Sequence, residues 1–203
     1  MQDALGPTYS GQCFLYVLAV AGHEDLLKVG MSRDPLARWS SFHPRWFETF
    51  DLDLGLLVET ETRTDAQALE TRLHRRLVDH RCPVPLTMLL AAGGATEWYR
   101  GAYQMARDFV LALEPAGYVV HSESRTWLGQ AMAVARDQLA SLVQQAFEDQ
   151  CSGCLSPTQL TSIRDLVDSQ RSFGADIDLL IPPDVLHELG LSRRAHERRF
   201  MES

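Results

Sequence analysis

The pattern of apolar and polar positions divides the chain into a mixed first half and a helical second half. Apolar runs rich in Val, Leu and aromatic residues predict strands at 13–21, 26–31 and 52–60. Turn-forming residues at 21–25 separate the first two runs, which indicates a hairpin. We therefore expect an α+β fold in which a small three-stranded antiparallel sheet is flanked by helices.

Helices are predicted between and after these strands. Asp34 followed by Pro35 is a typical helix start, and Pro44 ends the segment. The face of this first helix would carry Leu36, Trp39, Ser40 and His43. Thr64-Asp65-Ala66-Gln67 fits a capping box for a second helix with apolar positions at 66, 69, 73 and 77. A third helix is expected over 102–113, where Pro115-Ala116-Gly117 follows.

The second half has helical periodicity throughout. Apolar residues recur at helical spacing from 126 to 149, and shorter helices are indicated near 157–170 and 183–199. We place a boundary near residue 122, which gives an N-terminal arm (1–12), an α+β domain (13–122) and an α-helical module (123–203). The 126–149 stripe could pack onto the first domain or form a homodimer interface, and the module could instead target DNA.

Composition is that of an ordinary globular chain, with 45% hydrophobic and 23% charged residues in 203. It contains no run of 18 apolar residues, so we expect no membrane span. The first residues carry an early acid and no basic segment before an apolar stretch, so no secretion signal is expected. Four irregularly spaced cysteines do not form a disulfide framework and favour a reducing, cytoplasmic location.

Charge changes this picture in two ways. There are 19 basic and 27 acidic residues, a net charge of −8, which argues against an extensive basic surface for nucleic acid. Local clusters exist nonetheless, around His74, Arg75 and Arg76 and in the C-terminal segment 193–199. Lys28 is the only lysine, so that every other basic residue counted is arginine.

Several common sites lack support in this sequence. Phosphate-loop, dinucleotide-binding, H-E-x-x-H and G-x-S-x-G motifs are absent. Cys151 and Cys154 form a single CxxC without a second pair. His80 and Cys82 could complete four ligands in principle, so the residues leave zinc binding open, although the sequence pattern does not favour it.

An ordered series of short motifs lies in the first half. It consists of Phe14-Leu15-Tyr16, Lys28-Val29-Gly30, Arg38, Glu70 and Glu97-Trp98-Tyr99. Its order, spacing and strand–strand–helix context resemble the GIY-YIG nuclease superfamily, in particular its phage-associated branch with a Lys-Ile/Val-Gly second motif. The resemblance covers roughly residues 13–110 and implies an endonuclease that hydrolyses DNA phosphodiester bonds with Mg²⁺ or Mn²⁺.

The resemblance implies catalytic roles for four of these residues. Tyr16 would orient or deprotonate the attacking water. Lys28 stands where the motif that gives the superfamily its name has a second tyrosine, and it would lower the pKa of the Tyr16 phenol. Arg38 would stabilise phosphate charge with its planar guanidinium. Glu70 would hold the metal, because Mg²⁺ takes only one or two protein carboxylates and completes its shell with water and phosphate oxygens.

The same residues also allow other interpretations. Tyr16 could be a core tyrosine, Lys28 a solvated turn residue and Arg38 an exposed helix arginine. Glu70 could form only an i,i+4 surface pair with His74. We expect Glu97 to hold a loop in place, without a catalytic role.

Additional substrate contacts are predicted at four positions, namely His43, His74, Arg75 and Arg76. His43 lies five residues beyond Arg38, one too many for an i,i+4 pair. A domain with the same fold that binds nucleic acid or protein without cleaving it is the alternative function.

Overall fold

An antiparallel sheet organises the first part of the computed structural model, which describes residues 12–22, 24–86, 88 and 97–192. Its strands are β1 (Cys13–Val20), β2 (Leu26–Ser32), β3 (Phe50–Thr60), β4 (Trp98–Arg100) and β5 (Val120–His121). They lie in the order β4-β2-β1-β3-β5, and every neighbouring pair is antiparallel. The predicted α+β class is thus confirmed.

The predicted extent of the sheet was wrong, because the described residues form five strands where three were expected. The three long strands form the centre, and β4 and β5 add one short strand at each edge. A segment of two or three residues is too short to show alternation in sequence. These edge strands exist because backbone groups of β2 and β3 pair with them.

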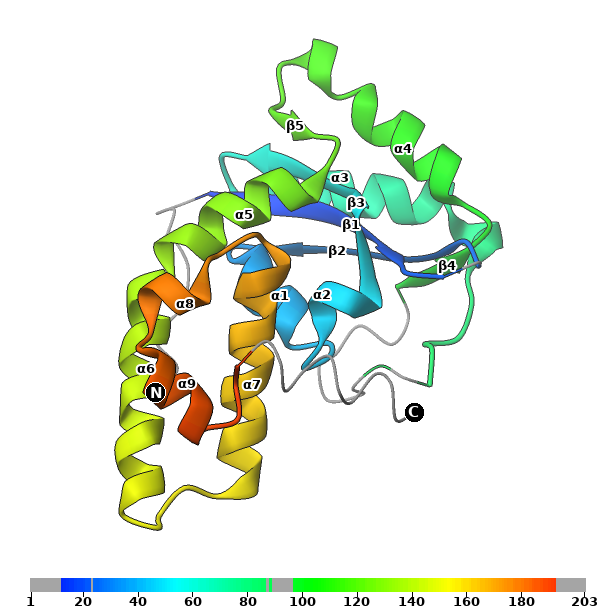
Figure 1. Ribbon diagram of the computed structural model, residues 1–203. Helices are drawn as coiled ribbons and strands as arrows, with labels where there is room; N and C mark the ends of the chain where they lie inside the picture. The colour runs from blue at the N-terminus through cyan, green and yellow to red at the C-terminus, as the bar shows by residue number, and fades with distance from the viewer. Residues whose placement is uncertain (1–11, 23, 87, 89–96, 193–203) are drawn as a thin grey trace. The chain divides into compact units, whose positions relative to one another are not determined.

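The two faces of the sheet are covered by different helices (Figure 1). Leu15, Val17 and Ala19 of β1 face a core formed with α3 (Arg63–Arg76) and α4 (Tyr103–Leu111). The alternate residues Tyr16 and Leu18 point to the opposite face, as the twofold period of a strand requires. That face carries α1 (Pro35–Ser40) and α2 (Trp46–Thr49).

Helix α1 begins where the sequence predicts. Asp34 is the N-cap, its carboxylate accepts a hydrogen bond from the N–H of Ala37 at 2.9 Å, and Pro35 occupies the first turn. The helix ends at Ser40, however, so His43 does not share its face. His43 instead lies in the turn before α2, where its Nδ1 accepts a hydrogen bond from the N–H of Arg45 at 3.0 Å.

Helix α3 begins earlier than its predicted capping box. Thr62 is the N-cap, and its hydroxyl accepts a hydrogen bond from the N–H of Asp65. The Thr60 hydroxyl donates to the carbonyl of Thr62 at 3.0 Å, so the chain turns into the helix as soon as β3 ends. The predicted cap at Thr64 was therefore wrong, whereas Ala66, Leu69, Leu73 and Leu77 are buried as expected.

The chain separates into two compact units between Ala131 and Met132. Helix α5 (Ser124–Val134), which the sequence assigns to the second module, lies mostly in the first unit. There the Ser124 hydroxyl donates to the carbonyl of Leu52 at 3.0 Å, and Trp127 packs edge-on against Phe14.

The second unit is helical over its described residues. It contains α6 (Arg136–Cys151), α7 (Pro157–Ser172), α8 (Ile177–Leu180) and α9 (Pro183–Glu188). The single helix predicted over 126–149 is divided between α5 and α6 at Ala135. The unit has its own apolar core, to which Leu139, Val143 and Val167 belong. The basic C-terminal segment 193–199 lies outside the residues that the structure describes.

Within the described ranges, no helix has both the length and the apolar character that crossing a membrane requires.

Candidate active site

Tyr16 lies at the centre of β1 and pairs in register with Gly30 of β2. The phenol ring packs over Gly30, because a Cβ at that position would lie 2.4 Å from the hydroxyl oxygen and 2.6 Å from Cζ. Trp39 of α1 also contacts the ring, in an edge arrangement with 5.9 Å between centroids. The glycine of Lys28-Val29-Gly30 is therefore required for the position of Tyr16.

Arg38 is the cation at the Tyr16 hydroxyl. Its Nε–H donates to Tyr16 Oη at 3.5 Å, and its guanidinium lies 4.7 Å from the centre of the Phe42 ring. Burial raises the pKa of Tyr16 to about 12, although the hydrogen bond and charge of Arg38 act to lower it. The direction is opposite to that expected from the sequence, since burial outweighs the neighbouring cation.

Lys28 is buried and pairs with Glu97. Its Nζ lies 2.5 Å from a carboxylate oxygen of Glu97, and the Phe42 and Trp98 rings are each 5.8 Å from Nζ. Burial lowers the pKa of Lys28, while the hydrogen bond and charge of Glu97 raise it. Lys28 faces Leu18 across the β1–β2 ladder, so the lysine anchors Glu97, whereas Arg38 contacts the tyrosine.

Glu97 is the site residue whose role the sequence missed. The N–H of Val29 donates to the carbonyl of Glu97 at 3.1 Å, so the residue lies beside β2 just before β4 begins. Its partner Lys28 is 69 positions away in the sequence. Its place in the Glu97-Trp98-Tyr99 motif is the signal that could have identified it.

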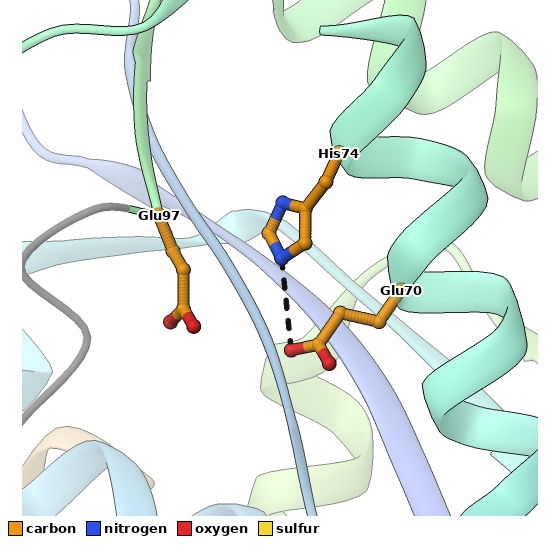
Figure 2. Close-up of side chains that lie close together, drawn as sticks. All are labelled: Glu70, His74 and Glu97. Carbon is orange, nitrogen blue, oxygen red and sulfur yellow. Dashed lines mark ion pairs between the residues drawn. The ribbon is translucent and has the colours of Figure 1, made fainter. Parts of the chain in front are cut away.

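Glu70 and His74 project from α3 toward Glu97, as Figure 2 shows. The Nε2 atom of His74 lies 3.8 Å from Glu70 Oε1, and one ligand atom from each of the three residues lies within 4.8 Å of the others. The side chains are only 15%, 19% and 33% exposed for Glu70, His74 and Glu97. Among the described residues this is the one group of three or more His, Cys, Asp and Glu side chains with metal-binding spacing.

Tyr99 holds the other nitrogen of His74. The two rings stack with centroids 5.8 Å apart, and Tyr99 Oη lies 2.6 Å from His74 Nδ1. Burial raises the pKa of Tyr99, and a hydrogen bond from Arg81 opposes this rise. His74 is therefore fixed with Nδ1 toward Tyr99 and Nε2 toward Glu70.

Electrostatic coupling joins these groups into one site. The charges of Glu97 and Glu70 both act to raise the pKa of Tyr16, and Arg38 and Glu70 both influence Lys28. The structure thus brings Tyr16, Lys28, Arg38 and Glu70 together. The set can bind an anion through the Arg38 guanidinium, beside the carboxylates of Glu70 and Glu97.

The remaining candidate contacts lie elsewhere on the chain. Arg75 and Arg76 are exposed on α3, where with Arg72 they line a groove against Phe109. His43 takes part in the turn between α1 and α2. Cys151 and Cys154 are exposed and are not joined by a disulfide.

The donor set fits a divalent cation. Two carboxylates and one imidazole converge from α3 and from the start of β4, and carboxylate oxygen is the ligand that Mg²⁺ and Mn²⁺ prefer. Ligands of one ion at about 2.1 Å lie at most about 4.2 Å apart. The cluster would therefore close on an ion with a small side-chain rotation.

One comparison with known proteins gives a match. The family model of the T5orf172 domain matches residues 13–114, which include every residue of the site. No curated protein and no solved structure matches the chain.

Proposed function

Because the chain belongs to the T5orf172 domain family, a phage-associated family related to GIY-YIG-like nucleases, we propose that it is an endonuclease that hydrolyses DNA phosphodiester bonds with Mg²⁺ or Mn²⁺. The observation that carries this proposal is the meeting of Arg38, Tyr16, the Lys28–Glu97 pair and Glu70 around one point of the sheet. Phosphodiester hydrolysis needs an oriented water and charge neutralisation at phosphorus, and these groups supply both.

Arg38 would bind the scissile phosphate. Its guanidinium is held between the Tyr16 hydroxyl and the Phe42 ring, which fixes the planar group in one orientation. A fixed guanidinium matches the geometry of two non-bridging phosphate oxygens and stabilises the charge that develops on them.

Tyr16 would orient the attacking water and keep its own proton. With a pKa of about 12, forming the phenolate at pH 7 would cost about 7 kcal/mol. The hydroxyl accepts a hydrogen bond from Arg38, so its proton is directed to another acceptor, such as the water oxygen. Of the two roles that the resemblance implies for Tyr16, orientation is the one its burial favours.

Glu70 would hold the metal ion, which when bound supplies charge neutralisation at the phosphate and lowers the pKa of coordinated water. Lys28 would act as a positioning residue, because its buried ammonium fixes the carboxylate of Glu97 at the same site.

Cleavage assays test the proposal. Plasmid and single-stranded DNA are incubated with the protein and Mg²⁺, Mn²⁺ or EDTA, and the same is done for Arg38→Ala and Glu70→Gln. Metal-dependent cleavage that falls by at least about 100-fold in both variants is expected, in line with the loss of a group that stabilises transition-state charge. Cleavage that survives both substitutions would contradict the residue assignment.

Matched controls separate catalysis from folding. Arg125→Ala removes an arginine whose guanidinium pairs with Asp53 at 2.7 Å on the surface of the first unit. Glu148→Gln neutralises an exposed carboxylate of α6. Both controls are expected to cleave like the unaltered protein.

A second function is favoured by two observations. The high pKa of Tyr16 suits a domain that does not cleave, and the net charge of −8 suits one whose partner is a protein. DNA binding without cleavage in the same assays would select a binding module, and the absence of both would select a protein-interaction module.

A further inference from the structure

We propose that His74 and Glu97 join Glu70 as metal ligands, so that the site binds first-row transition metals such as Mn²⁺ and Co²⁺ more tightly than Mg²⁺, and that Tyr99 is the residue that positions His74. This inference rests on the proposed metal-dependent function. It differs from the single metal-binding glutamate that the resemblance implies, because it adds a nitrogen ligand and a second carboxylate.

The side chains of the three proposed ligands point toward one another. Glu70 and His74 are one helical turn apart on α3, so both point to the same side of the helix, and Glu97 faces them from the start of β4 (Figure 2). At 3.8 Å, His74 Nε2 and Glu70 Oε1 are too far apart for a direct hydrogen bond. That separation suits two atoms that share one ion.

The imidazole of His74 is held in an orientation that suits metal binding through Nε2. A histidine that binds metal through Nε2 carries its proton on Nδ1 and donates it to a fixed acceptor. Tyr99 Oη lies 2.6 Å from Nδ1 and the stacked rings prevent rotation, so Tyr99 supplies this acceptor. With the proton on Nδ1, Nε2 is the atom left to bind a metal, and it faces Glu70 (Figure 2).

Glu97 is held in position by Lys28. Lys28 is fully buried and its ammonium contacts one carboxylate oxygen of Glu97. A carboxylate has two oxygens, so the same group can bind Lys28 with one and face the ion with the other. The lysine thereby limits the rotation of Glu97 and keeps it opposite α3.

Ligand chemistry then determines the choice of metal. Imidazole nitrogen suits transition metals, whereas Mg²⁺ prefers an all-oxygen shell and gains little from a nitrogen ligand. Replacing His74 should therefore weaken Mn²⁺ and Co²⁺ binding much more than Mg²⁺ binding.

Metal binding to the full chain without DNA tests the proposed preference for transition metals. Calorimetric titration with Mn²⁺, Co²⁺ and Mg²⁺ is compared for the unaltered protein, His74→Gln and the control His187→Gln, which changes an exposed histidine of α9. We expect His74→Gln to weaken Mn²⁺ and Co²⁺ by at least about 10-fold and Mg²⁺ by less than about 3-fold. Nitrogen hyperfine coupling to bound Mn²⁺, measured by pulsed electron paramagnetic resonance, should disappear in His74→Gln and persist in His187→Gln.

Tyr99→Phe tests the positioning role. The substitution removes only the hydroxyl at Nδ1 and should weaken Co²⁺ about 10-fold while the nitrogen coupling of Mn²⁺ is retained, because the ligand itself remains. Tyr103→Phe is the matched control, since its hydroxyl donates to the carbonyl of Leu54 and not to a site residue.

The outcomes separate this inference from the proposed function. If Glu70→Gln loses Mn²⁺ and His74→Gln binds it unchanged with the nitrogen coupling intact, the inference is overturned and the metal-dependent nuclease stands. If neither Mn²⁺ nor Mg²⁺ binds the unaltered chain, the inference is overturned, and the metal dependence of plasmid cleavage decides whether the proposed function stands.

Discussion

Gly30 shows how the lack of one side chain shapes the site. The phenol ring of Tyr16 occupies the space over this glycine, and a Cβ would approach the ring to 2.4–2.6 Å. Trp39 of α1 packs against the same ring, so a shift of the tyrosine would change its contact with α1.

We therefore expect Gly30→Ala to destabilise the protein by about 1–3 kcal/mol and to abolish cleavage, because the ring and its hydroxyl are displaced. Urea unfolding and the plasmid assay measure the two effects. The double variant with Tyr16→Phe should lose less stability than the sum of the single variants, since the hydroxyl accounts for the shortest contact. Simple additivity would contradict this account.

The buried phenol of Tyr16 predicts a dependence of stability on alkaline pH. The pKa of this tyrosine is raised from about 10 in the unfolded chain to about 12 in the folded protein, so the folded state keeps a proton that the unfolded state releases. Its contribution is complete below pH 10 and is lost as pH rises toward 12.

Urea unfolding at pH 8, 10 and 11 tests this prediction. The stability difference between the unaltered protein and Tyr16→Phe should shrink by about 1–2 kcal/mol from pH 8 to pH 11. Tyr103→Phe is the control for a less buried phenol, and it should show a smaller change with pH. A difference that is constant with pH would contradict the raised pKa.

At the scale of elements, the short strand β4 completes the site. It pairs with only the first half of β2, from Leu26 to Lys28, and Glu97 lies directly before it. The pairing places the Glu97 carboxylate over the buried ammonium of Lys28.

Glu97→Gln should destabilise the protein by about 1–3 kcal/mol at pH 7, because it leaves the Lys28 ammonium buried without its anion. Burial lowers the pKa of Lys28, so the cost should decrease as pH rises and the amine loses its charge more readily than an exposed lysine does. Thermal unfolding at pH 7 and pH 9.5 measures both. Glu24→Gln is the control, since its pair with Arg100 is 63% exposed on both sides and contributes at most about 1 kcal/mol.

The helices and strands differ in how well the sequence predicts them. The three long strands, the Asp34 cap and the buried stripe of α3 follow from patterns of six or more residues and agree with the structure. Strands β4 and β5 and the helix α2 are two to four residues long and depend on pairing partners far along the chain, so local patterns do not predict them. The same reason hid Glu97, whose role depends on Lys28.

At the scale of the whole molecule, the described residues include an apolar core in each of the two units. One lies between the sheet and helices α3 and α4, and the other lies among the helices after Met132. All four tryptophans, at positions 39, 46, 98 and 127, belong to the first unit. Tryptophan fluorescence therefore reports the first unit, whereas far-ultraviolet circular dichroism also reports the helices of the second.

We expect unfolding curves from these two probes to differ. Val143→Ala, which truncates a fully buried residue of the second core, should shift the circular dichroism curve to lower urea and leave the fluorescence curve nearly unchanged. Val17→Ala in the first core should shift the fluorescence curve fully to lower urea and shift only the part of the circular dichroism curve that the helices of the first unit contribute. Coincident shifts for both variants would show that the two cores unfold as one.

The homodimer predicted through 126–149 stays a prediction, and the structure limits how it would form. Leu128, Leu139 and Val143 of this stripe are buried within the chain, whereas Leu142 is 41% exposed. A dimer through this segment would therefore use the Leu142 side of α6, and Leu142→Glu should convert it to a monomer. Light scattering at several concentrations measures the mass of each.

The burial of Lys28 has a consequence for chemical labelling. Because it is the only lysine and has no exposed surface, reagents that acylate side-chain amines have no accessible target in the folded protein. Their reaction with Lys28 would require the sheet to open. The rate of its acylation would therefore time the opening of this domain without any introduced probe.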